Sequence, residues 1–217
     1  HKINLYPALS PYQFFAPHAG VLYGQTDLLN ALKVDRLRVS TDELPSPANG
    51  GMSRWELGTQ SYESLAGTTA AVDYLASLGT RFGGADGSSS RRVRLECSWR
   101  AIQAHENELK REFLEGVSNM GGEVRVLGHV DTSHVALEAR TPTFAISKRG
   151  ISAAALAEAL VKQGIWCTAG NHYAQFWAAQ SSGLANNEDG MTRIGFLHYN
   201  TLAEVGRVVE AIERATA

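Results

Sequence analysis

The stretch SPYQFFAPHAGVLYG, residues 10–24, places the nitrogen-bearing side chains of Gln13 and His18 in a loop between two strand-like segments. The amide nitrogen of Gln13 is delocalised into its carbonyl, so at neutral pH it is neither a nucleophile nor a base. It can still donate and accept hydrogen bonds, for example to a phosphate-bearing ligand. A lone histidine such as His18 is more often a hydrogen-bonded structural residue than a catalyst. The loop therefore predicts polar binding rather than covalent chemistry.

A second candidate for ligand binding is the pair Gly58 and Thr59, which precedes a predicted helix. Glycine allows close approach of the backbone, and a hydroxyl beside a helix N-terminus favours an anion. Thr59 could instead serve only as the N-cap of that helix. Both interpretations stay open at the level of sequence.

A third candidate is Arg193 in the strand-like segment MTRIGFLHY, residues 191–199. Alternation along a strand puts Ile194 and Phe196 on one face and Arg193 and Gly195 on the other. The apolar pair should pack on helices, so Arg193 is expected to point into a cleft between domains. The alternative is an arginine on the surface of an edge strand.

Metal and nucleotide chemistry have little support in the sequence. Cys97 and Cys167 have no metal-like or disulfide-framework spacing, and His129 and His134 have no further ligand nearby. The chain contains no P-loop and no dinucleotide-binding glycine motif after a strand.

Composition excludes several classes of function. The chain has 217 residues, 44% of them hydrophobic and 19% charged, as is typical of a globular protein with a real core. Its net charge is −2 with no basic face, which argues against nucleic acid as a principal partner. No apolar run approaches the roughly 20 residues of a membrane span. A reducing, cytoplasmic compartment is the expected location.

The first half of the chain is predicted to hold a few short elements and one long helix. In chain order we expect a strand at 3–9, a strand at 20–23, a helix at 27–32, a loop at 44–53, a helix from Thr59 to Gly79, and a break at 83–90. Thr59 is the predicted N-cap of the long helix and Gly79 its stop. Leu65, Val72, Leu75 and Leu78 form its predicted apolar stripe.

The second half alternates helices and strands. We expect a helix at 92–119, strands at 123–128, 141–147 and 164–170, a helix at 152–163, a strand at 191–199 and a final helix from Thr201. Ser152 is the predicted N-cap of the middle helix and Gly164 its stop, whereas Thr201 and Glu204 form a capping box. Leu202, Val205, Val209 and Ile212 should supply the buried stripe of the last helix.

The predicted fold class is α/β, with a large-domain remnant at 1–45, a connecting loop and helix at 46–90, and a small α+β domain at 91–217. The chain begins with His1 and runs at once into a strand-like segment. We therefore expect that an upstream part was removed or never present.

Five stretches, taken together and in order, resemble the cysteine-desulfurase-like branch of the class V aminotransferases. They are SPYQFFAPHAGVLYG, RWELGTQSYESLAG, AAVDYLASLG, GIWCTAGNHYA and TRIGFLHYNTLAEV. Members of this family are pyridoxal-phosphate (PLP) enzymes of fold type I. The resemblance spans nearly the whole chain but matches only the C-terminal portion of such proteins.

The resemblance assigns roles to the residues already singled out. It places Gln13 at the position of the lysine that forms a Schiff base with PLP, and a carboxamide cannot form that bond. It implies a phosphate contact for Gly58 and Thr59, often to the neighbouring subunit's cofactor, and a loop-ordering role near the cofactor for His18. It implies that Arg193 binds the α-carboxylate of an amino acid, a task suited to a guanidinium fork.

The GN-x-Y motif implies that His172 and Tyr173 line the substrate pocket, although both could be packing residues. Tyr173 occupies the position of the sulfur-accepting cysteine of true desulfurases, which disfavours that activity. Cys167 lies in a strand-like segment and is better explained as a small buried hydrophobe. The family's aspartate beside the pyridinium nitrogen and its ring-stacking side chain would lie upstream of His1.

The resemblance thus implies a PLP-dependent class V aminotransferase-type protein acting on an amino acid, here without Schiff-base formation. The alternative is a catalytically inactive paralogue or fragment that serves as a binding or scaffold subunit. The expected partners are an amino-acid substrate and either a second copy in a homodimer or a complementary N-terminal half.

Overall fold

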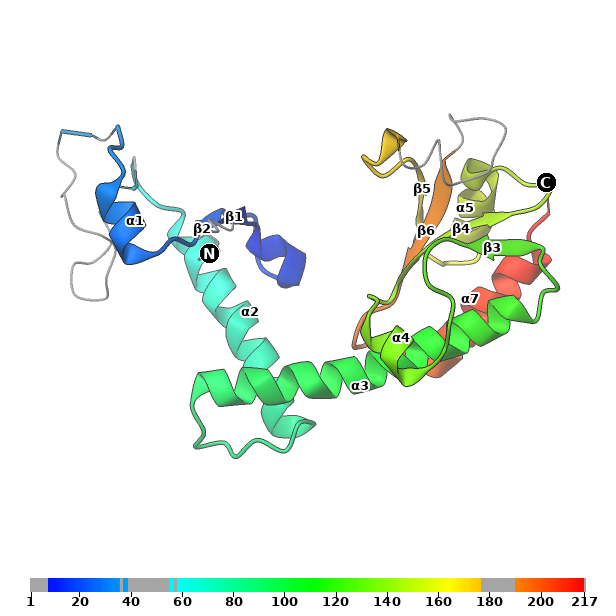
Figure 1. Cartoon of the computed structure of the whole chain (residues 1–217), viewed down its shortest axis with the longest axis horizontal. Coiled ribbons are helices and arrows are strands. Elements are labelled where there is room, and N and C mark those ends of the chain that lie inside the picture. The colour runs from blue at the N-terminus through cyan, green and yellow to red at the C-terminus, as the bar shows by residue number, and fades with distance from the viewer. Residues whose placement is uncertain (1–7, 36, 39–54, 57, 177–189, 217) are drawn as a thin grey trace. The chain divides into compact units, whose positions relative to one another are not determined.

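The computed structural model describes residues 8–35, 37–38, 55–56, 58–176 and 190–216 (Figure 1). The chain forms two compact units, His1–Ser98 and Trp99–Ala217, each of which is described here by itself. The predicted division at residues 45/46 and 90/91 stays a prediction. The predicted loop at 44–53 and most of the predicted strand at 3–9 lie outside the described residues.

The first unit begins with a small antiparallel ladder around a loop. Strand β1 (Ala8–Leu9) pairs with β2 (Val21–Leu22), with Ala8 opposite Leu22 and Leu9 opposite Val21. The loop between them contains a short 3-10 helix, η1 (Pro11–Phe14), and α1 (Thr26–Ala31) follows β2. The pairing of β1 with β2 holds the two ends of the loop together. The backbone of the loop is therefore fixed at both ends.

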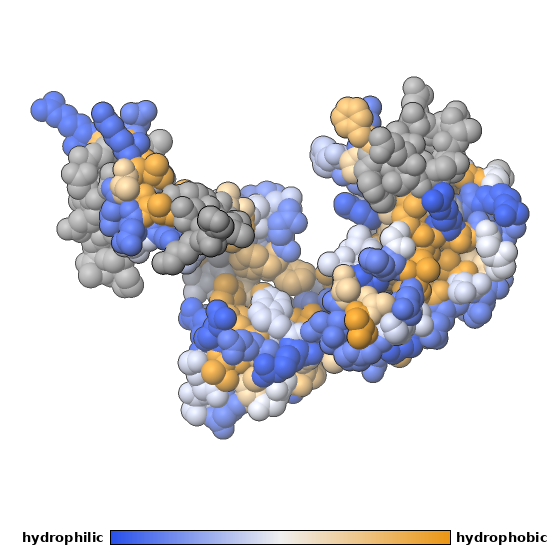
Figure 2. Space-filling view, viewed as in Figure 1, coloured by the Kyte–Doolittle hydropathy of each residue, from blue (hydrophilic) through white to orange (hydrophobic). Residues whose placement is uncertain are grey.

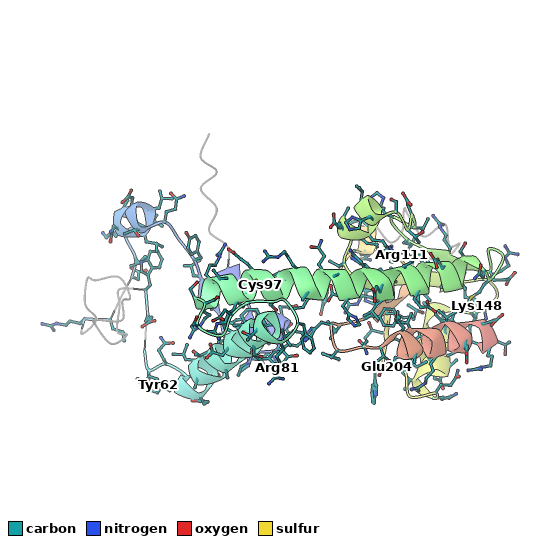
Figure 3. All side chains as sticks on the ribbon, turned by 90° about the horizontal axis from the view of Figure 1, so that it is seen from below. Tyr62, Arg81, Cys97, Arg111, Lys148 and Glu204 are labelled. Carbon is teal, nitrogen blue, oxygen red and sulfur yellow. The ribbon has the colours of Figure 1, made fainter. Side chains whose placement is uncertain are left out.

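Helix α2 (Tyr62–Arg81) differs from its predicted limits at both ends, which Figure 3 labels. The N-cap is Ser61, so the predicted capping role of Thr59 is wrong. Gly79 was expected to end the helix but lies inside it and is buried. The reason is packing: a Cβ on Gly79 would lie 1.8 Å from the Arg94 carbonyl oxygen of α3 (Arg91–Ser118). Glycine here permits contact between helices rather than a stop.

The predicted apolar stripe of α2 is correct only in its C-terminal half. Leu75 and Leu78 are buried, whereas Leu65 is 46% exposed. The buried positions lie on the turns nearest Gly79, where α2 meets the first turns of α3. Thr68 and Thr69 donate their hydroxyl protons to carbonyls one turn back, so these hydroxyls are satisfied within the N-terminal half of the helix.

The second unit is built on a four-stranded antiparallel sheet in the order β3-β4-β6-β5. Its elements are β3 (Val124–Val126), α4 (His134–Glu138), β4 (Thr143–Lys148), α5 (Ala153–Val161), β5 (Thr168–Gly170), β6 (Met191–Gly195) and α7 (Leu202–Arg214). The predicted strands and helices are all present. The strand expected at 164–170 is shorter and begins only at Thr168.

The core of this unit lies between one face of the sheet and the helices. Phe113 of α3, Phe144 of β4 and Phe196 form a buried aromatic cluster, with centroids 4.2 Å apart for Phe113 and Phe144. Thr192 on the same face donates to the Ala153 carbonyl oxygen of α5 at 2.9 Å. Side chains of the opposite face are exposed or half-exposed, apart from the buried Met191 at the start of β6.

The predicted helix caps of the second unit are confirmed. Ser152 Oγ accepts from Ala155 N at 3.1 Å, and Gly164 follows α5 with a left-handed φ of 76°. Thr201 and Glu204 make both bonds of the capping box. The predicted stripe of α7 is wrong at Leu202, which is 44% exposed. Burial instead follows Val205, Val208, Ala211 and Ile212, whereas Leu202 is the first residue of the helix.

Two lysines have structural roles that the sequence did not indicate. Lys110 of α3 is only 2% exposed, and its Nζ donates to the carbonyl oxygens of Leu137 and Arg140. These bonds cap the C-terminal end of α4. Burial lowers the pKa of Lys110, and burial also raises the pKa of the Glu106 carboxyl one turn earlier. Glu106 and Lys110 thus place two ionisable side chains one turn apart on α3, and Lys110 reaches the end of α4.

The second lysine, Lys148, caps α7 and yields a stability prediction. Its Nζ, labelled in Figure 3, donates to the carbonyl oxygens of Ile212, Glu213 and Ala215 at 2.6–2.7 Å. The Lys148→Met variant keeps the aliphatic stem but leaves these helix-end carbonyls without a donor. We expect it to lower the free energy of unfolding by about 1–2 kcal/mol in urea denaturation.

The matched control for Lys148 is Lys162→Met, which removes an exposed ion pair with Glu158 one turn away on α5. Exposed pairs of this kind contribute little, so the control should unfold like the unmodified protein. Equal losses in the two variants would contradict the capping role of Lys148.

In the described parts of the chain, no helix combines the length and apolar character that crossing a membrane requires. The same residues bring together no group of three histidine, cysteine, aspartate or glutamate side chains able to hold a metal ion.

Candidate functional site

The loop that carries Gln13 is held in one conformation by local bonds. Gln13 N donates to Ser10 O at 3.0 Å, and Ser10 Oγ donates to Ala19 O at 3.4 Å. Phe15 takes a left-handed φ of 73°, which closes η1 because its neighbour Ala16 then donates to Pro11 O. Ala16 itself needs no left-handed backbone, so alanine fits there as well as glycine would.

Helix α2 supports this loop. The ring of Phe15 meets Tyr74 edge-on with centroids 6.3 Å apart. A Cβ on Gly67 would lie 2.5 Å from Pro17 Cγ, so the loop packs closely on the helix. The helix thus fixes the position of the loop, and the side chain of Gln13 is exposed at its turn.

His18 lies in the same loop and stacks on Tyr12, with ring centroids 4.7 Å apart and planes inclined by 16°. Stacking of this kind orients both rings. The geometry therefore supports a loop-ordering role for His18, while its predicted position near a cofactor stays a prediction.

Gly58 and Thr59 lie just before α2, three residues or more from its first residue Tyr62. Thr59 is exposed and Gly58 half-buried, and a Cβ on Gly58 would meet nothing within 4 Å. The Ser61 side chain makes no capping bond to the helix. With the capping explanation of Thr59 overturned, the predicted phosphate contact stays a prediction.

Arg193 lies at the centre of the exposed face of the sheet. Its strand partners are Ala145 on β4 and Thr168 on β5, both with small side chains. Burial alternates along β6 as predicted: Ile194 and Phe196 are buried, whereas Arg193 is exposed. Arg193 is one of the residues that line a hollow of about 540 Å³ in this face. Within the described residues it forms no ion pair with a carboxylate.

His172 and Tyr173 follow β5 in a tight turn. Both have left-handed backbone, with φ of 51° and 64°, and Tyr173 N donates to Asn171 Oδ1. His172 Nε2 donates to Met191 O at 3.1 Å, which ties the turn to the first residue of β6. Tyr173 extends fully into solvent. His172 thus lies near the strand of Arg193, whereas among the described residues no contact of the Tyr173 side chain supports its predicted role.

Cys167 is half-buried and packs against the core of the second unit. Its Sγ lies 3.8 Å from Ala157 O, and burial raises the pKa of the thiol. A raised pKa disfavours the thiolate, which is the reactive form. The structure therefore supports the interpretation of Cys167 as a small buried hydrophobe.

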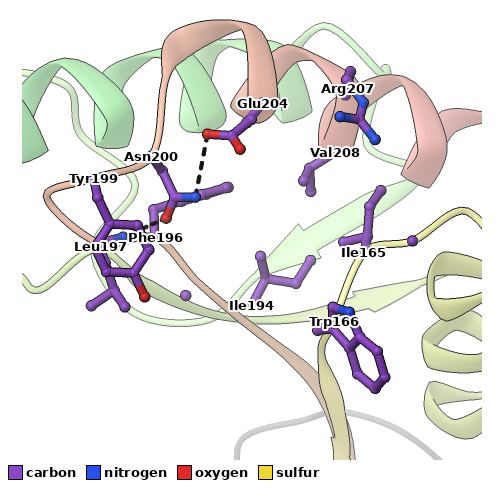
Figure 4. A pocket seen from close by; sticks show the side chains of 12 residues that line it. Ile165, Trp166, Ile194, Phe196, Leu197, Tyr199, Asn200, Glu204, Arg207 and Val208 are labelled. Atoms are coloured by element: carbon purple, nitrogen blue, oxygen red, sulfur yellow. Dashed lines mark hydrogen bonds between the residues drawn. The ribbon is translucent and has the colours of Figure 1, made fainter. Parts of the chain in front are cut away.

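A second hollow, of about 370 Å³, lies between α7 and the end of β6 (Figure 4). Its polar edge is the turn that starts α7: Asn200 Nδ2 donates to Glu204 Oε2, and Thr201 N donates to the same oxygen. The latter bond is the main cause that lowers the pKa of Glu204. These groups serve the helix start. Tyr199 and Arg207 also line this hollow, and Trp166 and Gly195 line both hollows.

The structure brings the predicted residues together in two groups. Gln13 and His18 share one loop of the first unit, and Gly58 and Thr59 belong to the same unit. His172, in the turn after β5, and Arg193 on β6 both belong to the second unit.

Trp166, which no pattern in the sequence marked, lines the same hollow as Arg193. An aromatic residue in an apolar segment looks like a core residue, so no sequence signal marked it.

The protein-family model for aminotransferase class V matches residues 92–208, which is more than half of the chain. The chain belongs to the class V aminotransferase family. The matched segment includes His172, Tyr173 and Arg193 but not the loop of Gln13.

Curated relatives cover nearly the whole chain at low identity. An aminotransferase-like protein of Gibberella zeae is 26% identical over 208 residues, which are 95% of this chain and 44% of that protein. A probable cysteine desulfurase of Mycobacterium leprae is 26% identical over 220 residues, 97% of this chain and 44% of the relative. The chain therefore spans less than half the length of these relatives.

Solved structures show the fold. The cysteine desulfurase CsdA of Escherichia coli matches 97% of this chain with 45% of its own, at a TM-score of 0.60 and 20% identity. A cysteine desulfurase of Thermococcus onnurineus matches 95% of this chain with 45% of its own, at a TM-score of 0.68 and 20% identity. The predicted fold class is confirmed: the chain has the fold of part of a cysteine-desulfurase-type protein.

Proposed function

We propose that this protein binds an amino acid through Arg193 in the manner of its family but forms no Schiff base with PLP. The observation that carries the proposal is Gln13, which the resemblance places at the position of the Schiff-base lysine.

The residues of the loop do not fit a covalently attached PLP. The turn around Gln13 is well formed, since η1 is closed by its own bonds and packed on α2. What it presents is a carboxamide, which has no nucleophilic lone pair on nitrogen. Lys33 is the nearest described lysine along the chain, and it lies beyond β2 and α1. The loop therefore supports hydrogen bonding to a ligand and no covalent bond.

Arg193 supports the amino-acid part of the proposal. A guanidinium group binds a carboxylate with two parallel hydrogen bonds. The small partners Ala145 and Thr168 leave the exposed face around Arg193 accessible from above the sheet. His172, held by its bond to Met191, lies beside the same strand and is the second candidate to contact the amino acid.

The test is chemical. The protein is mixed with PLP, reduced with borohydride, and mapped by peptide mass spectrometry. We expect no stoichiometric phosphopyridoxyl group on any lysine and no borohydride-sensitive absorbance band. Stoichiometric labelling of one lysine would show that an amine elsewhere replaces the missing one and would contradict the proposal.

A second candidate function is a binding or scaffold subunit that covers its surface with a partner. Apolar side chains are exposed around the β1–β2 ladder: Leu22 is 51% and Tyr23 61% exposed. Figure 2 shows apolar surface on the first unit beside α1. We propose a second copy or a complementary N-terminal half as the partner. Light scattering of the purified protein tests this, because a monomer with no affinity for itself would exclude the homodimer.

A further inference from the structure

The hollow beside Arg193 contains an exposed indole that no structural role explains. Trp166 is 88% exposed, although tryptophan is usually at least partly covered when no ligand or partner contacts it. It lies two residues before Thr168, the strand partner of Arg193. Trp166 precedes β5 and is not part of the strand, but it lines the same hollow as Thr168 and Arg193.

The neighbours of Trp166 agree with this assignment. Ile165 and Cys167, which flank it, are partly buried against the core, and Cys167 also lines the hollow. In Figure 4 the indole of Trp166 is turned away from Arg207 and Val208 on α7. Trp166 and Arg193 also line the same hollow, together with Thr143, Thr168 and Gly195.

Glycine at position 195 makes room beside the indole. Gly195 lies two residues after Arg193 on β6 and pairs with Thr143 of β4. The pairing of β5 with β6 begins at Thr168 and Arg193, and Trp166 and Gly195 lie just beyond it, where both line the hollow. A Cβ on Gly195 would meet only Thr143 Oγ1, at 3.7 Å. The space beside the backbone of Gly195 is therefore open.

The spacing fits a small molecule with a charged end and a flat apolar end. Two residues along a strand span about 7 Å, at roughly 3.4 Å per residue. That is about the distance between the backbone positions of Arg193 and Gly195 on β6. The other polar side chains that line the hollow are the hydroxyls of Thr143 and Thr168 and the thiol of Cys167, whose pKa is raised by burial.

We propose that Trp166 and Gly195 make this hollow selective for an amino acid with a planar, apolar side chain, whose carboxylate binds Arg193. The side chain stacks on the indole above Gly195. The inference rests on the proposed function, since it uses Arg193 as the carboxylate-binding residue. It adds the substrate class and two residues that determine specificity.

The experiment compares L-phenylalanine with L-alanine as ligands of the ¹⁵N-labelled protein. The amide and indole N–H signals are followed by NMR in titrations up to millimolar concentrations. We expect L-phenylalanine to bind roughly tenfold more tightly than L-alanine. Shifts should include the Trp166 indole N–H, assigned with the Trp166→Phe variant. No binding of either ligand would overturn the inference.

Variants separate the inference from the proposed function. Trp166→Ala and Gly195→Val should each reduce the preference for L-phenylalanine to about threefold or less, with binding of L-alanine nearly unchanged. Arg193→Gln should weaken both ligands roughly tenfold or more. Trp99→Ala and Arg125→Gln replace an exposed tryptophan and an exposed-face arginine that do not line the hollow, and both should bind like the unmodified protein.

The Arg193→Gln and Trp166→Ala results distinguish failure of the proposed function from failure of the specificity inference. If Arg193→Gln leaves both affinities unchanged, the carboxylate role in the proposed function is wrong, and with it the inference. If Arg193→Gln weakens both ligands but Trp166→Ala keeps the preference, only the inference about specificity is overturned.

Discussion

The Gln13→Lys variant should become labelled at residue 13 when it is incubated with PLP and reduced with borohydride. The unmodified protein has a carboxamide there and cannot form the bond, so the change is from no label to a label. The loop needs no rearrangement to accept lysine, because Gln13 is exposed and the turn is held by the backbone and by packing on α2. Peptide mapping by mass spectrometry measures the label directly.

Two comparisons make this result specific. The Gln13→Arg variant adds a cation without a nucleophilic amine, and it should stay unlabelled at residue 13. Lys33 is exposed in the same unit and measures the background reactivity of an ordinary lysine. We expect the amine introduced by Gln13→Lys to react faster than Lys33 if the loop lies beside a PLP-binding surface. Equal rates would argue that the loop no longer binds the cofactor at all.

The Gly79→Ala variant should lose about 2 kcal/mol or more of unfolding free energy, against the direction that helix propensity predicts. Alanine is favoured over glycine inside a helix by about 1 kcal/mol. At this position, however, a Cβ would lie 1.8 Å from the Arg94 carbonyl oxygen and 2.9 Å from Ser98 N. Both atoms belong to the backbone of α3 and cannot rotate away, so the two helices must separate.

The control for Gly79 is Gly206→Ala on α7, where a Cβ would meet nothing within 4 Å. There only propensity acts, and we expect a gain of about 0.5–1 kcal/mol. Urea denaturation followed by circular dichroism measures both variants, and hydrogen exchange at Leu75 and Leu78 reports the contact of α2 locally. A stabilised Gly79→Ala variant would contradict the close packing of α2 on α3.

Features that depend on a few neighbouring residues were predictable. The capping box of Thr201 and Glu204 and the N-cap at Ser152 follow from hydrogen bonds within one helical turn. The burial of Ile194 and Phe196, with Arg193 on the other face, follows from the alternation of a strand. These patterns fold the same way wherever they occur, which is why the fold class was predictable as well.

Features that depend on distant segments were not predictable. Thr59 has the side chain of an N-cap, but the helix begins after Ser61. Gly79 is a residue type that often ends a helix, but α2 continues past it and α3 packs against it. Leu202 fits the period of α7, yet it is 44% exposed at the first position of the helix. In each case the local signal was present and a tertiary contact, or its absence, decided the outcome.

The sequence by itself determined the chemistry of residue 13, the caps of α5 and α7, and the family to which the chain belongs, because these depend on side-chain type and short spacing. Only the tertiary structure decided that Lys110 and Lys148 cap helices far away in the sequence. It alone placed Trp166, Arg193 and Gly195 around one hollow. That arrangement depends on the pairing of β5 with β6, two strands separated by many residues, and pairing over such distances leaves no pattern in either segment alone.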